Sequence, residues 1–278
     1  MSSDTLNDSR VLVAAKLLAG LALTYGLVVL LLALMEPRLL YPRPDVERSQ
    51  LSDLASNVGA TELTVVTSDG LPLYAWRMGE GPMVIYFSGN GSTVGAPIPR
   101  YRRLIDAGFS VLHVNYRGYP GSTGEPSEPG LIRDALAAWD RARMTHEPQD
   151  IVIFGRSLGG GVALALAASL DEEPRALVID SSFTSAVEVA RETWWWLPVG
   201  RLMRNRWDSM GRAGELDLPA LVVHSRDDEM IPVEHGRRLA EQLDAQYVEV
   251  QGYAHNDDAL GEPEVWKAFL ALTSKQGL

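Results

Sequence analysis

The sequence predicts an α/β protein with a doubly wound, mostly parallel sheet of eight strands, preceded by one long apolar helix. From residue 61 onward, short β-branched runs alternate with helical stretches. Such alternation is typical of parallel strands joined by right-handed helical crossovers. Ahead of it, the 19 residues of 17–35 carry no formal charge and are rich in Leu, Val and Ala.

The apolar stretch 17–35 indicates a membrane anchor. At about 1.5 Å per residue it would span roughly 28 Å, close to the ~30 Å hydrocarbon thickness of a bilayer. A cleaved signal peptide is one alternative, but the stretch runs into Glu36 and Pro37 without a small-x-small cleavage site. A buried core helix is the other. We assign 1–36 to a single-pass anchor, 37–60 to a linker and 61–278 to the globular domain.

Composition narrows the classes of partner. The chain has 278 residues and a formal net charge of −11. Because charges cancel within residues 1–40, the negative excess belongs to the rest of the chain and disfavours nucleic acid and anionic lipid surfaces. Any membrane attachment is therefore hydrophobic. Basic residues are nearly balanced before and after the span, so they do not indicate on which side of the membrane the domain lies. With no cysteine, disulfides and thiolate sites are excluded, and we expect neither metal nor cofactor.

The alternation resolves into individual elements. Strands are expected at 62–67, 71–77, 83–87, 110–115, 151–155, 176–180, 220–225 and 246–250. Helices are expected at 100–107, 131–145, 158–170, 233–243 and 263–274. The first two strands flank a Ser-Asp-Gly turn and predict an antiparallel hairpin. In such sheets functional residues gather at the carboxyl ends of the parallel strands.

One of these strand ends carries a G-x-S-x-G motif. The buried strand 151–155 runs into Gly155, Ser157 and Gly159, and an Ala/Leu-rich helix follows at once. This strand–turn–helix setting predicts that Ser157 is a nucleophile and that the Leu158 backbone N–H faces a developing oxyanion. The alternative is a glycine-rich turn needed only for close packing. Phosphate binding is disfavoured, since no Lys-Ser/Thr pair follows the glycines.

A serine nucleophile needs an imidazole base. Of the five histidines, His255 lies in the loop directly after the last predicted strand and is the candidate base. His113 and His224 lie within predicted strands and are expected to be core groups. His146 and His235 belong to helical stretches.

The base needs a carboxylate to orient it. Asp228 follows the penultimate strand, which gives the chain order Ser, Asp, His that this arrangement uses. Asp227 and Asp180 remain alternatives on chemistry alone. We expect the acidic neighbours of the chosen residue to be solvated or paired with Arg226.

Six segments together resemble one known family. They are Y-F-S-G-N-G at 86–91, N-Y-R-G-Y at 115–119, G-R-S-L-G-G at 155–160, D-S-S-F-T-S at 180–185, H-S-R-D-D-E-M-I-P at 224–232 and G-Y-A-H-N-D at 252–257. From about residue 37 to its end the chain resembles the membrane-anchored α/β-hydrolase-domain (ABHD-type) serine hydrolases and their bacterial relatives. The resemblance implies the α/β-hydrolase fold, Asp228 as the acid and the Asn90 backbone N–H as a second oxyanion donor. Ser88 departs from the pattern, because the family has histidine there.

An insertion at 183–217 is expected to form a small helical cap. It contains Trp194, Trp195 and Trp196, all three candidates for the substrate pocket. An apolar cap on an anchored hydrolase suggests acyl substrates, so we expect an ester or thioester hydrolase acting on lipid-like molecules. A non-catalytic scaffold, a membrane-tethered peptidase and an acyltransferase are the alternatives. The sequence leaves the oligomeric state open.

Overall fold

A single eight-stranded sheet forms the centre of the molecule. The computed structural model describes residues 3–274. The strands are β1 (Thr61–Val66), β2 (Pro72–Met78), β3 (Met83–Phe87), β4 (Ser110–Val114), β5 (Ile151–Arg156), β6 (Ala176–Asp180), β7 (Ala220–Ser225) and β8 (Gln246–Val250). Their spatial order is β1-β2-β4-β3-β5-β6-β7-β8, with β2 antiparallel to both neighbours and every other pairing parallel. The predicted mostly parallel, doubly wound sheet is confirmed.

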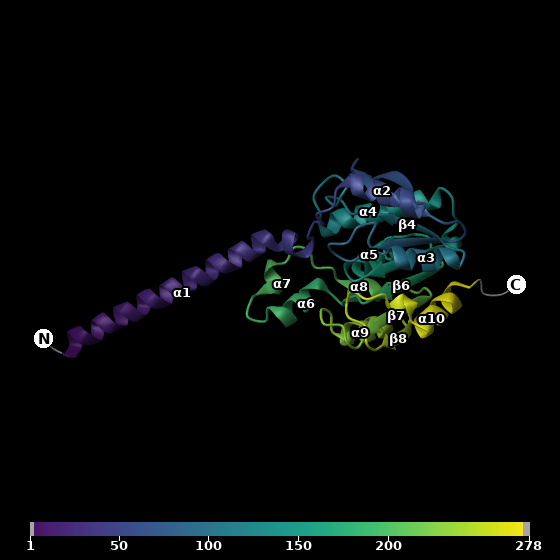
Figure 1. Ribbon diagram of the computed structural model, residues 1–278. Coiled ribbons are helices and arrows are strands. Elements are labelled where there is room, and N and C mark those ends of the chain that lie inside the picture. Colours follow the sequence, from purple (N-terminus) through teal and green to yellow (C-terminus); the bar gives the residue numbers. More distant parts are fainter. Residues whose placement is uncertain (1–2, 275–278) are drawn as a thin grey trace.

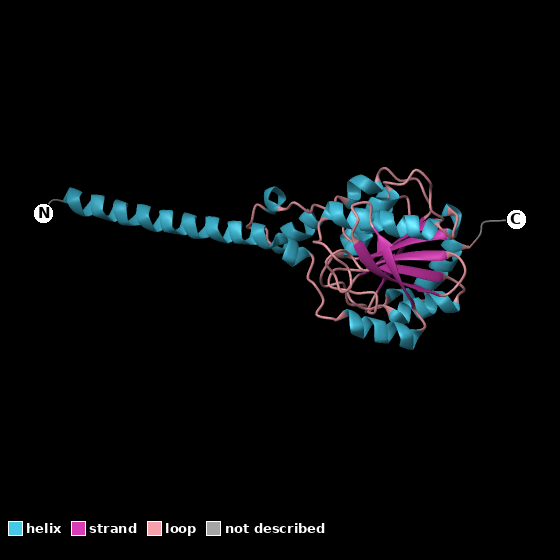
Figure 2. Cartoon of the chain, turned by 90° about the horizontal axis from the view of Figure 1, so that it is seen from above, coloured by secondary structure: helices cyan, strands magenta, loops and turns pink. Residues whose placement is uncertain are grey.

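Helices cover both faces of the sheet (Figure 2). One layer holds α4 (Glu128–Arg143), α5 (Leu158–Ala167), α8 (Ser209–Ala213) and α9 (Val233–Gln242). The opposite layer holds α2 (Arg48–Val58), α3 (Ile98–Asp106) and α10 (Pro263–Thr273). Side chains of one strand alternate between these layers: Ile85 belongs to the first core and Val84 to the second. Strands buried on both faces explain the continuous apolar runs.

Helix α2 lies inside the stretch predicted to be a linker. A capping box between Glu47 and Gln50 begins it, and Gly59, in the left-handed conformation with φ 72°, ends it. Its buried residues, Leu51 and Ala55, pack in the same core as Trp76. Only these two side chains of the helix are fully buried, so its sequence carries a weak amphipathic signal. Residues 48–58 are therefore part of the packed domain.

Helix α1 (Ser3–Leu40) projects from the domain as one long rod (Figure 1). Among the residues that the structure describes, Leu12–Leu40 is the one helical segment long and apolar enough to cross a membrane. Side chains from Leu12 to Val28 are exposed, whereas the last three turns bury one face against the domain. The exposed part alone measures about 26 Å at the rise of an α-helix.

A set of three short helices fills the chain between β6 and β7, within the stretch predicted to be a cap. They are α6 (Ala186–Thr193), α7 (Val199–Leu202) and α8. Two short 3₁₀ turns, Pro148–Asp150 and Ala259–Gly261, complete the described elements. Helices α6 and α7 lie beside the domain end of α1 (Figure 1), and Tyr25 of α1 donates a hydrogen bond to the Trp196 carbonyl oxygen at 3.1 Å.

A buried ion pair fixes the loop after β4. Asp134 of α4 accepts hydrogen bonds from the backbone N–H and from Nε of Arg117, both at 2.8 Å. The two side chains are 2% and 5% exposed. Arg117 is also bound by Asp69 at 2.9 Å. This loop carries Tyr116 and Tyr119, which reach the site described below.

Removing Asp134 should be costly, because the buried Arg117 loses its buried counter-charge and two hydrogen bonds and keeps the partly exposed Asp69 as its remaining described acidic partner. We expect Asp134→Ala to lower the free energy of unfolding by about 3–5 kcal/mol. Asp140→Ala, at an exposed position of the same helix, should change it by less than about 0.5 kcal/mol. Urea unfolding of both variants, followed by circular dichroism, measures the difference. Equal costs would contradict the assigned role of the pair.

Candidate active site

The turn between β5 and α5 places Ser157 at the end of a central strand. Ser157 has φ 51° and ψ −120°, a conformation that non-glycine residues rarely adopt. Its backbone N–H donates to Asp180 O at 2.9 Å, and its carbonyl accepts from Ser182 Oγ at 2.8 Å. These contacts hold the strained turn in place. Ser182, which had no role in the sequence prediction, and the backbone of Asp180, which was an alternative acid there, therefore support the turn.

Two glycines allow α5 to approach the sheet. A Cβ on Gly159 would lie 2.1 Å from Phe87 O, and one on Gly155 would lie 2.2 Å from Gly159 O. Backbone atoms cannot move aside as a flexible side chain can. The close approach puts the first N–H groups of α5, Leu158 among them, beside the loop that follows β3.

A continuous hydrogen-bonded chain joins the three residues proposed from the sequence. His255 Nε2 lies 3.0 Å from Ser157 Oγ, and His255 Nδ1 lies 2.7 Å from Asp228 Oδ2. Asp228 Oδ1 accepts from the backbone N–H groups of Met230 and Ile231 at 2.9 and 2.8 Å. The carboxylate is fully buried and the imidazole is 3% exposed.

Electrostatics keep the Asp228 carboxylate ionised. Burial alone would raise its pKa, but hydrogen bonds from His224 and His255 and from the Ile231 N–H outweigh that effect and hold the pKa well below its usual value. His224 Nε2 lies 3.5 Å from Asp228 Oδ2 and 2.9 Å from Ile231 O. His224 therefore lies in the core, next to the acid rather than next to the serine.

The other acids near the site have different partners. Asp180 binds Arg100 at 3.0 Å and lies 3.5 Å from Arg156. Asp227 accepts from the Gly252 N–H at 2.6 Å, and Glu229 accepts from the His255 N–H at 2.9 Å. We had expected the neighbours of Asp228 to be solvated or paired with Arg226. Both residues are exposed to solvent, as expected, and neither pairs with Arg226, because both also accept hydrogen bonds from the histidine loop.

Arg226 instead binds Glu249 of β8, at 2.6 Å. The three consecutive acids, Asp227, Asp228 and Glu229, each bind a different group of the histidine loop. Their adjacency in the sequence gave no sign of this, since the loop that they bind lies about 25 residues away along the chain.

Aromatic hydroxyls and a histidine shape the loop after β3. Ser88 Oγ lies 3.2 Å from His113 Nε2, and Ser88 O accepts from Tyr116 OH at 2.9 Å. Tyr119 OH accepts from the Gly91 N–H at 3.2 Å. Burial lowers the pKa of His113 to about 3, so its imidazole is neutral. A histidine from β4 therefore contacts the loop at the position where the related family carries its own histidine.

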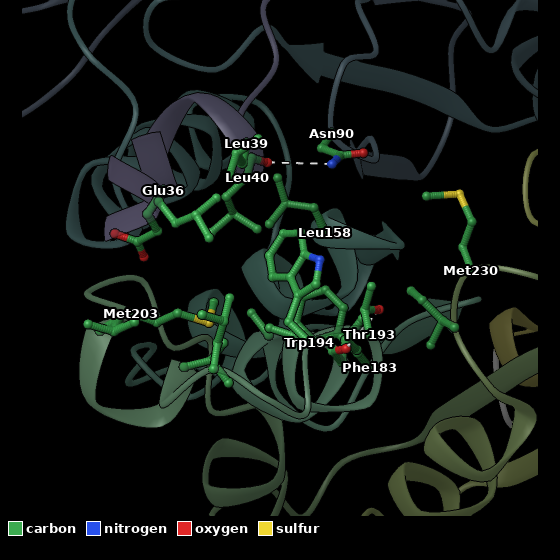
Figure 3. A pocket seen from close by; sticks show the side chains of 18 of the residues that line it. Glu36, Leu39, Leu40, Asn90, Leu158, Phe183, Thr193, Trp194, Met203 and Met230 are labelled. Carbon is green, nitrogen blue, oxygen red and sulfur yellow. Dashed lines mark hydrogen bonds between the residues drawn. The ribbon is translucent and has the colours of Figure 1, made fainter. Parts of the chain in front are cut away.

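Two cavities meet at Ser157. The first, of about 320 Å³, is apolar and lies between Leu158, the cap helices and the end of α1 (Figure 3). The second, of about 470 Å³, is polar and is lined by Arg100, Arg156, His255 and Asp258 among others. Asn90 lines both cavities, as Ser157 does.

The three tryptophans of the cap diverge. Trp194 lines the apolar cavity, whereas Trp196 packs on Tyr25 of α1 with ring centroids 6.5 Å apart. Trp195 is 82% exposed, and neither it nor Trp196 lines a described cavity. Because α6 ends at Thr193, the three side chains leave a turn in different directions. Of the three tryptophans predicted to be pocket residues, Trp194 is the one that lines a described cavity.

The glycine contacts can be tested by stability. We expect Gly159→Ala to destabilise the chain by about 1–3 kcal/mol, because the added methyl meets backbone atoms. Gly161→Ala is the matched control, since its nearest neighbours are side-chain atoms at 3.2 Å and beyond, and it should cost less. The midpoints of urea unfolding of the two variants measure the difference in stability. A cost for Gly161→Ala equal to that of Gly159→Ala would argue against the tight seating of α5.

Comparisons with known proteins agree with the fold. A sequence model of the family described as serine aminopeptidase, S33, matches residues 81–210. An uncharacterised protein of Mycobacterium tuberculosis is 36% identical over 229 residues, covering 78% of this chain and 81% of that protein. The lysophosphatidylserine lipase ABHD12 of Danio rerio is 30% identical over 190 residues, covering 62% of this chain and half of that protein.

Among solved structures, a Pyrococcus furiosus esterase is similar with a TM-score of 0.65. The match covers 84% of this chain and 96% of the esterase, at 18% sequence identity. At that identity the likeness concerns the fold. Sheet order, the turn at Ser157 and these relatives lead to one conclusion: the chain belongs to the α/β-hydrolase family.

Proposed function

We propose that the chain is a serine hydrolase that cleaves carboxylic esters or thioesters of acyl groups, with Ser157, His255 and Asp228 as its catalytic triad. The observation that carries the proposal is the hydrogen-bonded chain from Ser157 Oγ through both ring nitrogens of His255 to Asp228. A serine made nucleophilic by a base that a third group orients is the common pattern of acyl transfer.

The proposed reaction has two stages. His255 Nε2 takes the proton of Ser157 while Oγ attacks the acyl carbonyl carbon, and the carbonyl oxygen becomes an oxyanion. The backbone N–H groups of Leu158 and Asn90 are the proposed donors to that oxyanion. His255 then protonates the leaving alcohol or thiol as the carbon–heteroatom bond breaks. A water molecule, deprotonated by His255, releases the acid and restores Ser157.

Asp228 orients the imidazole and balances its charge. With Nδ1–H donated to Asp228, Nε2 is left to accept the serine proton. Since hydrogen bonds hold the pKa of Asp228 well below its usual value, the carboxylate remains an anion when the imidazole becomes cationic. This matches the role of the acid in a Ser-His-Asp arrangement.

The two cavities support an amphiphilic substrate. The apolar cavity is suited to an acyl chain, because burying hydrocarbon there is favourable. The polar cavity, on the same serine, offers hydrogen-bonding groups of Arg156 and Asn256 to a leaving group. A relative named as a lysophosphatidylserine lipase is consistent with acyl ester chemistry.

We also infer that α1 is a retained membrane anchor. Its exposed part, from Leu12 to Val28, is apolar except for Lys16 and is close in length to the thickness of a hydrocarbon core. A signal peptide would be removed, yet Glu36 and Tyr41 are 7% and 1% exposed and bind the cap. Loss of those contacts would leave buried polar groups of the domain without partners, which favours retention.

Peptide hydrolysis has less support. An aminopeptidase binds the substrate ammonium group, for which a carboxylate near the serine is the natural partner. Asp258 lines the polar cavity but is paired with Arg100, and Glu36 lines the apolar cavity and binds the cap through Oε1, while its buried Oε2 has no partner among the described residues. A non-catalytic scaffold would need no such chain of contacts from Ser157 to Asp228.

An activated serine should react with a fluorophosphonate probe. We expect the full chain, purified in detergent, to be labelled once per molecule, and Ser157→Ala to remain unlabelled. Ser56→Ala is the control, because Ser56 is an exposed serine of α2 that lines none of the described cavities. Intact-mass spectrometry counts the adducts. A folded wild-type chain that stays unlabelled would overturn the proposal.

The acid assignment can be tested with two adjacent residues. Asp228→Asn should lower kcat for p-nitrophenyl esters by a factor on the order of 10³–10⁴, because the amide cannot enforce the required tautomer. Asp227→Asn keeps an acceptor for the Gly252 N–H and should change kcat by less than about tenfold. Ester hydrolysis at saturating substrate measures both. A larger loss in the Asp227 variant would reassign the acid.

A further inference from the structure

The end of α1 forms one side of the apolar cavity. Leu32, Ala33, Glu36, Leu39 and Leu40 line it together with Ser157. Figure 3 shows the labelled α1 side chains on one side of the cavity and those of the cap, with Trp194 and Met203, on the other. The apolar helix thus borders the same space as the candidate nucleophile.

The contact follows the periodicity of a helix. Over the last three turns, Val29, Leu32, Ala33 and Glu36 are partly or fully buried, whereas Leu31 and Leu34 are 54% and 61% exposed. Spacings of three and four residues place the first group on a single face. One face of α1 therefore belongs to the domain, and the opposite face is free to meet lipid.

A buried polar contact fixes this face against the cap. Glu36 Oε1 accepts three hydrogen bonds, from the backbone N–H groups of Arg204 and Asn205 at 3.0 and 2.9 Å and from Asn205 Nδ2 at 3.2 Å. Tyr41 OH donates to Asn205 Oδ1 at 3.0 Å and accepts from Trp207 Nε1 at 2.9 Å. We call these five residues the cap latch.

The cap latch sets the register of the helix. A shift of one residue would rotate α1 by about 100° and carry Glu36 away from Asn205. Its carboxylate would then lose charge-assisted hydrogen bonds, which are stronger than neutral ones. At the end of the helix, the Leu40 carbonyl accepts a hydrogen bond from Asn90 Nδ2 at 3.5 Å (Figure 3). The helix is thereby held against both the cap and the loop that carries the proposed oxyanion donor.

We propose that α1 is an acyl-specificity element: Leu32, Ala33 and Leu39 form a fixed wall, the acyl wall, that determines which acyl chains reach Ser157. The proposal rests on the proposed function for its catalytic readout, and on the cavity alone for its binding readout. A simple tether would need neither a face that lines the cavity nor a carboxylate buried in the cap.

A bulky side chain on this wall tests the proposal. In the full chain embedded in lipid nanodiscs, Ala33→Trp should lower the kcat/KM ratio of p-nitrophenyl palmitate to acetate by about tenfold or more, since each methylene kept out of the cavity loses a factor of about four in binding. Leu34→Trp, one residue along and facing outward, should keep the wild-type ratio. Fluorophosphonate titration of each variant corrects for any misfolded fraction.

A second readout does not require catalysis. Because the chain has no cysteine, Ala33→Cys and Leu34→Cys each carry a single thiol. Added palmitate should slow maleimide modification of Cys at the first position about tenfold at saturation and leave the second unchanged. Intact-mass spectrometry over time gives the rates.

The outcomes separate the two proposals. Protection of Ala33→Cys by palmitate in a chain that hydrolyses no ester would uphold the acyl wall and refute the proposed hydrolase. Hydrolysis with the same chain-length profile in Ala33→Trp and Leu34→Trp, together with no protection of Ala33→Cys, would overturn the acyl wall and leave the hydrolase standing.

Discussion

The site depends on how closely α5 packs against the sheet. Without side chains at Gly155 and Gly159, the helix start lies almost in contact with the carbonyl of Phe87. That contact turns Ser157 into its strained conformation and brings the loop after β3 alongside. The imidazole and its acid then need only two further strand ends, which the parallel sheet supplies at the same edge. In this way the close packing of α5 against the sheet places Ser157 where the hydrogen-bonded chain to His255 and Asp228 can form.

Around that centre, each loop is braced from a distant part of the chain. The histidine loop is held by Asp227 and Glu229, and the loop after β3 by His113 and Tyr116. The cap is held by Glu36, which precedes the sheet in the sequence. Rigid polar supports surround an apolar cavity whose own lining makes few directional contacts. Such a combination would position the proposed triad and leave the selection of the proposed acyl group to the shape and volume of the cavity.

The strands and the main helices could be predicted because their signals are local. Continuous apolar runs, a serine between spaced glycines and a histidine after the last strand are all visible within short windows. The triad candidates followed from their places at strand ends. What escaped prediction depends on separation: Glu36 meets Asn205 across 169 positions, and α2 buries only Leu51 and Ala55. The directions of the three tryptophans escaped as well, because they depend on where α6 ends.

The two faces of the last turns of α1 are under different constraints. On the outward face, Leu31 and Leu34 are mostly exposed, so any apolar side chain of suitable length would serve at the proposed membrane contact. On the inward face, the size of the Ala33 side chain is limited by the cavity that it lines, and Glu36 is required by its hydrogen bonds to the loop at Arg204. If both proposals hold, substitutions that adapt the helix to a different membrane would occur on the outward face, and substitutions that change the acyl preference would occur on the inward face. The two faces of one helix could in this way vary independently of each other during evolution.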